Sequence, residues 1–303
     1  MRCIVPSLVL PLALLLIFDA PTPADDSLVW PFLLDGGAAS QPASPPATLP
    51  SEQPQTAGQR TLAEFLGHFS GYEPMYFIAG PVDPMVKWQF SFKYRVLNPN
   101  APLAEKFPPL AGLHFAYTQM ALWQIDKPSA PLFDTAYKPE FFWSNEDINY
   151  KIPGVAQWGF QGGYGHESNG RGGPDSREIN ILFARPIVTF GDLEHFHVSL
   201  APKFYTYIGS LYGNQDIWRY RGYCDFRTII GWRQGLELST IGRVGNHWNR
   251  GSVQLDLTYP LRNLLANNFD VYLDAQYFYG YGESLLTYNK RSSAFRIGLG
   301  LVR

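Results

Sequence analysis

The chain has 303 residues and a formal net charge of −2, which excludes the strongly basic surface expected of a nucleic-acid-binding protein. Charged residues make up 17% of the sequence and aromatic residues 16%, so charges are scarcer than the roughly 25% typical of soluble domains. This composition, with 28 glycines and 25 prolines, favours an all-β protein with many turns and an aromatic surface.

The first 24 residues predict a secretory signal peptide. Arg2 supplies the positive segment, Ile4–Phe18 forms an apolar stretch, and small residues follow as far as Ala24. Removal of this peptide would take Cys3 with it. Cys224 would then be the one cysteine left in the chain, so no intramolecular disulfide is expected.

Residues 25–60 predict a linker. The stretch Gly36–Arg60 is rich in Pro, Ala, Ser and Gln and has almost no large apolar side chains. Such a composition cannot bury enough apolar surface to form a core. We therefore expect the ordered domain over residues 61–303.

Several segments of this domain alternate with a period of two. In Val86–Val96, VKWQFSFKYRV, the even-numbered side chains are apolar and the odd-numbered ones polar. A soluble sandwich would turn the apolar face inward, whereas a membrane barrel turns it toward lipid; alternation alone does not distinguish the two. Similar segments occur at Leu113–Gln124, Trp158–Ser168, His195–Ile208, Gly251–Leu261, Phe269–Tyr279 and Phe295–Val302.

The spacing of these segments favours the membrane barrel. No segment after the signal peptide has the ~20 apolar residues of a spanning helix, but a closed barrel can also cross a membrane. Tyr and Trp cluster near the segment ends, as aromatic girdles do. At roughly 20 residues per strand and connection, residues 61–303 predict a transmembrane antiparallel β-barrel of about 12 strands.

Gln119 lies on the apolar face of the segment Leu113–Gln124. An amide that faces lipid is costly unless it is paired. Pairing with its copy in a second barrel would satisfy it. A position near the rim, with a hydrogen bond to water, is the alternative.

His166 and Ser168 share the apolar face of the segment Trp158–Ser168, which would place both on the outside of a barrel. The following GRGGPD (Gly170–Asp175) predicts a turn. A hairpin centred on Gly173 places Asn180 directly opposite His166. Ser168 could thus act as nucleophile, His166 as general base and Asn180 as the group that orients the imidazole.

The backbone amides of Ser168 and Gly170 are candidates for an oxyanion hole. The competing interpretation is a polar hairpin tip without catalytic function. The His-x-Ser pattern and the register of Asn180 do not decide between the two interpretations.

The stretch Tyr164–Arg185, YGHESNGRGGPDSREINILFAR, resembles the signature of the outer membrane phospholipase A family. Further blocks agree in order, and the similarity spans residues 71–302. These blocks are YTQMALWQ (Tyr117–Gln124), SAPLFDTAYKPEFF (Ser129–Phe142) and YGYGESLLTYN (Tyr279–Asn289).

The resemblance implies a 12-stranded barrel of the bacterial outer membrane that hydrolyses acyl esters of phospholipids, depends on calcium and is active as a homodimer. It implies Ser168 as nucleophile, His166 as base and acid, and Asn180 as its orienting partner. Which acyl position is cut, and whether lysophospholipids are cut as well, stay open.

The resemblance also implies the calcium ligands. They are the Arg171 carbonyl, the Ser176 hydroxyl and the carbonyl of Ser129 of the partner subunit, and all are oxygens that suit a hard cation. One position departs from the family. Gly173 stands where the family loop often carries an aspartate, and Asp175, after the proline, is the carboxylate that could compensate.

Two other functions fit parts of the pattern. A catalytically silent outer-membrane barrel could serve as a pore or a structural protein. A secreted β-sandwich that binds carbohydrate would share the alternation, although it would turn the apolar face inward.

Overall fold

The computed structural model describes residues 65–246, 249–265 and 270–303. The expected signal peptide and linker, residues 1–60, lie outside the described residues. Across the described ranges, none of the helices has the length and apolar character needed to cross a membrane.

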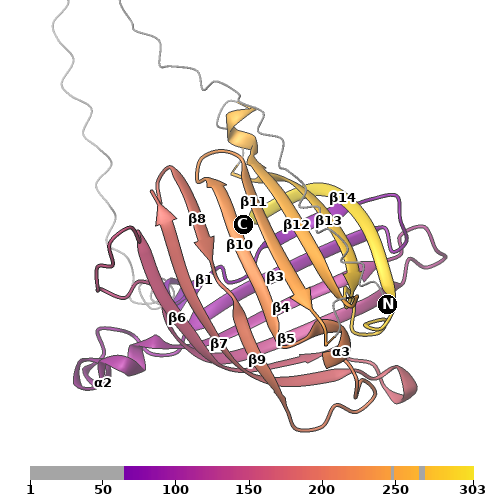
Figure 1. Ribbon diagram of the computed structural model, residues 1–303, viewed down its shortest axis with the longest axis horizontal. Helices are drawn as coiled ribbons and strands as arrows, with labels where there is room; N and C mark the ends of the chain where they lie inside the picture. Colours follow the sequence, from indigo (N-terminus) through magenta and orange to yellow (C-terminus); the bar gives the residue numbers. More distant parts are fainter. Residues whose placement is uncertain (1–64, 247–248, 266–269) are drawn as a thin grey trace, which may run out of the picture. The chain divides into compact units, whose positions relative to one another are not determined.

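Antiparallel strands form a single sheet that closes on itself, because β14 pairs with β2 (Figure 1). The strands are β1 (Phe69–Ser70), β2 (Met75–Ala79), β3 (Val86–Arg95), β4 (Leu113–Trp123), β5 (Leu132–Asn145), β6 (Gln157–Ser168), β7 (Glu178–Gly191), β8 (Phe196–Leu200), β9 (Lys203–Ile208), β10 (Cys224–Trp232), β11 (Glu237–Val244), β12 (Gly251–Pro260), β13 (Tyr272–Tyr281) and β14 (Arg291–Val302).

These 14 strand segments fill 12 positions around the barrel. β1 and β2 both pair with β3, and β8 and β9 both lie between β7 and β10. The prediction of an all-β, 12-stranded antiparallel barrel is confirmed. The prediction of one continuous segment His195–Ile208 is wrong: the strand breaks at Ala201 and Pro202, where proline has no N–H to donate.

Short helices occupy the connections. They are α2 (Pro102–Lys106), η1 (Pro108–Gly112), η2 (Gly173–Asp175), α3 (Trp218–Arg221) and η3 (Leu261–Asn263). The helix η2 lies in the turn of the β6–β7 hairpin. We use the term active-site end for the end of the barrel where this hairpin turns, because the hairpin carries the candidate catalytic residues. The connections 80–85, 124–131, 209–223 and 282–290 lie at the same end.

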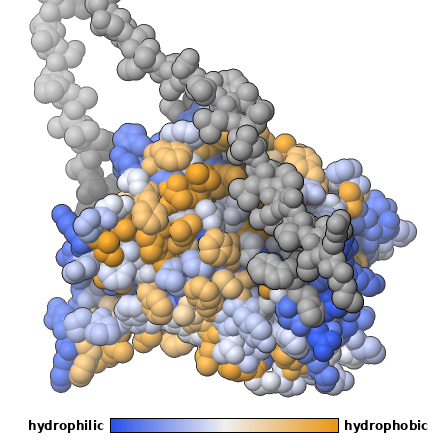
Figure 2. Space-filling view, viewed as in Figure 1, coloured by the Kyte–Doolittle hydropathy of each residue, from blue (hydrophilic) through white to orange (hydrophobic). Residues whose placement is uncertain are grey.

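The two faces of the barrel wall have opposite character. On β3, Lys87 and Ser91 are buried inside the barrel, whereas Phe90 is 50% exposed on its outside. Hydrophobic side chains cover much of the face seen in Figure 2. This arrangement is the one expected of a lipid-facing barrel, and it overturns the soluble sandwich, which would have buried the apolar face.

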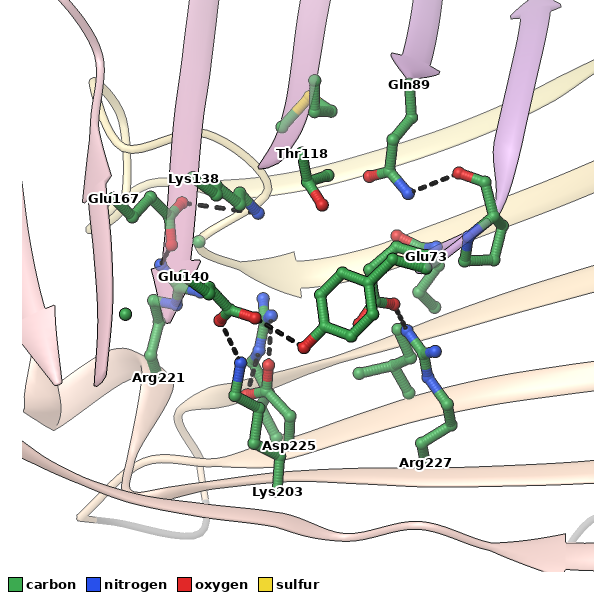
Figure 3. Close-up of a pocket in the computed structure, with 18 of the residues that line it drawn as sticks. Glu73, Gln89, Thr118, Lys138, Glu140, Glu167, Lys203, Arg221, Asp225 and Arg227 are labelled. Atoms are coloured by element: carbon green, nitrogen blue, oxygen red, sulfur yellow. Dashed lines mark hydrogen bonds and ion pairs between the residues drawn. The ribbon is translucent and has the colours of Figure 1, made fainter. Parts of the chain in front are cut away.

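Charged side chains cross the interior of the barrel and pair with one another (Figure 3). Glu73 contacts both Arg185 and Arg227, and Glu140 accepts hydrogen bonds from Lys203 and from the Tyr72 hydroxyl. A cavity of about 150 Å³ lies among these side chains. The pairing satisfies charges that would otherwise be costly to hold inside the barrel, and it fills the interior.

Candidate active site

The β6–β7 hairpin brings the candidate catalytic residues together. Its register runs without interruption from Gln157 opposite Thr189 to Ser168 opposite Glu178, and it places Asn180 directly opposite His166. Nδ1 of His166 lies 2.8 Å from Oδ1 of Asn180. An amide oxygen only accepts hydrogen bonds, so the imidazole donates and its Nε2 is left as the basic nitrogen.

The alternation of β6 places Tyr164, His166 and Ser168 on the outer face of the barrel, with Ser168 at the end of the strand. Glu167, between the histidine and the serine, faces inward and pairs with Arg221 at 2.9 Å and with Lys138 at 3.6 Å. Within the described residues Ser168 makes no hydrogen bond to His166. Catalytic hydrogen bonds of this kind often tighten only when substrate is bound.

Tyr164 makes a contact in the candidate site that sequence reasoning left out. Its hydroxyl donates to the same Asn180 oxygen at 2.5 Å. Two donors on one oxygen define which way the Asn180 amide points. The signal was available, because Tyr164 stands two residues before His166 on the same face and diagonally opposite Asn180.

Asn169 builds the loop that follows the serine. Its side chain is buried, and Oδ1 accepts the backbone N–H groups of Arg177 at 3.0 Å and Arg171 at 3.3 Å. Its Nδ2 donates to the Asp175 carbonyl at 2.9 Å. One side chain thus holds both sides of the loop 169–177 together, a role that the sequence pattern does not reveal.

Two glycines of this loop adopt backbone angles that other residues rarely adopt. Gly170 has φ +66°, and a Cβ there would lie 2.7 Å from the Tyr137 ring. Gly173 has φ +63°, but a Cβ there would meet no atom within 4 Å. Position 170 therefore requires glycine, whereas position 173 has room for a larger side chain at some backbone cost.

The loop offers oxygen atoms to a cation. The Arg171 side chain points back to the Phe133 carbonyl and lies 3.7 Å from Asp134. The backbone carbonyl of Arg171 stays on the loop. Ser176 and the exposed Asp175 add a hydroxyl and a carboxylate. Within the described ranges no three His, Cys, Asp or Glu side chains form a metal-binding group. A cation here would thus need carbonyl and hydroxyl ligands, which suit calcium.

Ser129 lies in the connection between β4 and β5 and does not belong to the same loop. It has φ +64°, and Ala130 after it has φ +39°. Left-handed backbone at two successive residues other than glycine is costly and often marks a functional position. Ser129 thus lies on a different connection from the Arg171 loop, although the Arg171 side chain reaches the Leu132 and Phe133 carbonyls at the start of the strand that follows Ser129.

The connection 209–223 supports the β6–β7 hairpin from the side. Asn214 is fully buried, accepts the Glu178 N–H at 3.0 Å and donates to the Glu178 carbonyl at 2.9 Å. Further along, Asp216 accepts a hydrogen bond of 2.5 Å from the Tyr288 hydroxyl. Burial, and then this hydrogen bond, raise the pKa of Tyr288, so the phenol stays a neutral donor.

Gln119 lies on the outer face of β4, and its Oε1 accepts a hydrogen bond of 3.1 Å from the Tyr117 hydroxyl. The strand register places Gln119 beside Tyr137 and Tyr137 beside Ser168. Gln119 and Ser168 therefore occupy one row across the barrel wall, roughly 10 Å apart at the usual strand spacing.

Comparison with known proteins agrees with this architecture. A family model described as phospholipase A1 matches residues 82–302. The phospholipase A1 of Klebsiella pneumoniae is 34% identical over 190 residues, which are 62% of this chain and 61% of that protein. The Salmonella typhimurium phospholipase A1 is 32% identical over 224 residues, 72% of this chain and 68% of that protein.

Solved structures show the same fold. Outer membrane phospholipase A from Escherichia coli superimposes with a TM-score of 0.64 and 25% identity, covering 77% of this chain and 98% of that one. A calcium-bound dimer of the Salmonella typhi outer membrane phospholipase gives the same TM-score and identity and covers 77% and 91%.

The closed barrel with its lipid-facing apolar wall defines the class first: this is a β-barrel enzyme of the bacterial outer membrane. Within that class, the match over residues 82–302 shows that the chain belongs to the phospholipase A1 family. The predictions of the family and of the outer-membrane location are confirmed.

Proposed function

We propose that this barrel is a calcium-dependent phospholipase that hydrolyses acyl esters of membrane phospholipids with Ser168, His166 and Asn180. The observation that carries the proposal is the hydrogen bond of 2.8 Å between His166 and Asn180 on the outer face of the barrel, with Ser168 beside it. A related E. coli phospholipase, solved with an active-site asparagine replaced by alanine, supports a role for such a residue.

In the proposed reaction, the Ser168 hydroxyl attacks the ester carbonyl and forms an acyl-serine. Nε2 of His166 accepts the serine proton and returns it to the oxygen of the leaving lysophospholipid. Water then cleaves the acyl-serine by the same route in reverse. Asn180 holds Nδ1–H, which fixes the tautomer and supports the imidazolium.

The oxyanion that forms on the ester would be stabilised by the backbone N–H groups of Ser168 and Gly170. Calcium would be held by the Arg171 carbonyl, the Ser176 hydroxyl, Asp175 and the carbonyl of Ser129 of the partner subunit. When bound there, the ion would add positive charge beside the oxyanion. The positive φ of Gly170 supports this arrangement, because it sets the direction of the loop after the serine.

Homodimerisation would complete the site. A single chain holds Ser129 on a different connection from the Arg171 loop, and the row from Gln119 to Ser168 supports a dimer face beside the hairpin. A monomer would then lack one calcium ligand. Assembly in the membrane would switch the enzyme on, and a related Salmonella typhi phospholipase forms a dimer with bound calcium.

The fatty acids released from phospholipids labelled at one acyl position would test the proposed hydrolysis and show its regiospecificity. Release of either labelled fatty acid by the refolded chain would support hydrolysis at both positions, and further cleavage of the lyso-product would add lysophospholipids as substrates. Ion conductance without release of any fatty acid would instead support the catalytically silent pore.

Replacing Tyr164 with phenylalanine is expected to lower kcat about tenfold and leave KM nearly unchanged, because the lost hydrogen bond orients Asn180. The pH profile of kcat should also shift, since a mobile Asn180 amide supports the imidazolium less well. Steady-state rates across pH would measure both effects. Tyr277→Phe is the matched control, since Tyr277 is an exposed tyrosine on β13. Equal kcat values and pH profiles for the two variants would contradict this role.

Replacing Gln119 with leucine is expected to weaken the dimer by a factor of about 3 to 20, the range expected for one amide pair in a membrane. Crosslinking or sedimentation in detergent with calcium would measure the shift toward monomer. Activity per chain should recover at higher protein concentration. An unchanged monomer–dimer equilibrium would remove Gln119 from the interface.

A further inference from the structure

Four cationic side chains at the active-site end form no ion pair within the part of the chain that the structure describes. They are Arg219, Arg250, Lys290 and Arg291. Inside the barrel the cations are paired, as Lys203 is with Glu140 and Arg243 with Asp225. Among the described residues, by contrast, these four have no carboxylate within the 4.0 Å of an ion pair. We call them, with Tyr220 and Tyr281, the rim cluster.

Aromatic rings order two of the four cations of the rim cluster, Arg250 and Arg291. The Arg250 guanidinium lies 4.8 Å from the centre of the Tyr220 ring, and the Tyr220 and Tyr281 rings are 5.2 Å apart. On the other side of this ring pair, the Arg291 guanidinium lies 5.6 Å from Tyr281 and 5.7 Å from Tyr279. The stack orders the guanidinium groups without neutralising them. Nη1 of Arg291 donates a hydrogen bond of 3.3 Å to the Tyr279 hydroxyl, and the other N–H donors of the guanidinium groups can meet a ligand.

The position of Arg291 indicates where that ligand comes from. Arg291 begins β14, and the next outward residues of this strand are Ser293, Phe295, Ile297 and Leu299. The last three are about half exposed, as lipid-facing side chains are. Arg291 and Tyr279 therefore lie where the apolar wall of the barrel ends and the headgroup layer begins.

The rim cluster is separate from the catalytic hairpin. In the closed order of strands, β13 and β6 lie on opposite sides of the ring, and Gln119 on β4 lies toward β6. The connection 209–223 runs from the hairpin to the rim cluster. Asn214 in this connection is hydrogen-bonded to Glu178 of the hairpin, and Tyr220 belongs to the rim cluster. A lipid held at the rim cluster would leave both the hairpin and the Gln119 face accessible.

We propose that the rim cluster binds the phosphate of a net-negative membrane lipid in the leaflet at the active-site end. Guanidinium groups match phosphate oxygens with paired N–H donors. Cations near a membrane surface attract anionic headgroups. The lipid, rather than free phosphate, is the occupant because the apolar column below Arg291 provides a surface for the acyl chains.

The test measures binding of single lipids to the refolded full chain in neutral detergent, by native mass spectrometry. Ether-linked phosphatidylglycerol and ether-linked phosphatidylcholine are the probes, since neither contains an acyl ester that the enzyme could cleave. The wild-type chain should bind the anionic lipid more tightly. The double variant Arg250→Gln/Arg291→Gln should lose about tenfold or more in affinity for it and bind phosphatidylcholine as before.

The control variant removes two cations at the opposite end of the barrel, Arg95→Gln/Lys106→Gln, and should retain the preference. If the double variant folds poorly, the single variant Arg291→Gln replaces it, because Arg291 is exposed. We expect this variant to lose part of the affinity for phosphatidylglycerol. Equal affinity for phosphatidylglycerol in wild type and both rim variants would overturn the proposal. So would complete displacement of the lipid by millimolar inorganic phosphate, which would mark the cluster as a site for the free anion.

Discussion

Replacing His166 with alanine is expected to lower kcat for phospholipid hydrolysis by about four orders of magnitude, because the serine then loses the base that accepts its proton. Asn180→Ala should lower kcat about a hundredfold, since the imidazole remains but loses the acceptor 2.8 Å from Nδ1. Initial rates in mixed micelles with calcium would measure both effects. His195→Ala is the matched control, as His195 is exposed and bonded to Asp192 in another connection.

The same pair of residues allows a sharper test. If Asn180 acts only through His166, then Asn180→Ala should hardly lower kcat in a chain that already carries His166→Ala. Losses that multiply in the double variant would mean that Asn180 acts independently of the histidine. The orienting role proposed for Asn180 would then be wrong.

Removing calcium is expected to reduce hydrolysis by about a hundredfold to a thousandfold, comparable to the loss of one strong oxyanion donor. Asp175→Asn should raise the calcium concentration needed for half-maximal activity. Gly173→Asp should lower it, because the position has open space and aspartate tolerates a left-handed backbone better than most residues.

Rates as a function of free calcium would measure these shifts, with Asp192→Asn as the control, since Asp192 is an exposed acid in another connection. Full activity in excess chelator would refute the proposed metal dependence. An unchanged calcium requirement in Asp175→Asn would leave the carbonyl and hydroxyl ligands of the loop in place and remove Asp175 from the site.

The alternation of residues predicted the strands, and the spacing of the segments with Tyr and Trp near their ends predicted a barrel rather than a sandwich. The alternation also predicted the register of the catalytic hairpin, since a turn centred on Gly173 leaves a single partner for His166. The same reasoning failed at β8 and β9, because apolar alternation continues through Pro202 although strand pairing does not.

Sequence patterns could not predict the contacts that form only when the barrel closes. Glu73 pairs with Arg185 and Arg227, which lie 112 and 154 residues away along the chain. Period-two patterning says that such residues face inward, but not which of them meet. Asn169 was missed for a different reason: its three hydrogen bonds to the backbone arise from the path of the loop, and many polar residues would fit the same pattern.

We propose that Ser168, on the outside of the barrel, is the nucleophile of a calcium-dependent phospholipase. The most direct test is phospholipid hydrolysis by the detergent-refolded full chain, comparing wild type with Ser168→Ala in calcium and in chelator. We expect hydrolysis only by the wild-type chain with calcium, with both proteins folded equally well. Hydrolysis by Ser168→Ala at the wild-type rate would rule out Ser168 as the nucleophile, and no hydrolysis by folded wild type in calcium would rule out a calcium-dependent phospholipase.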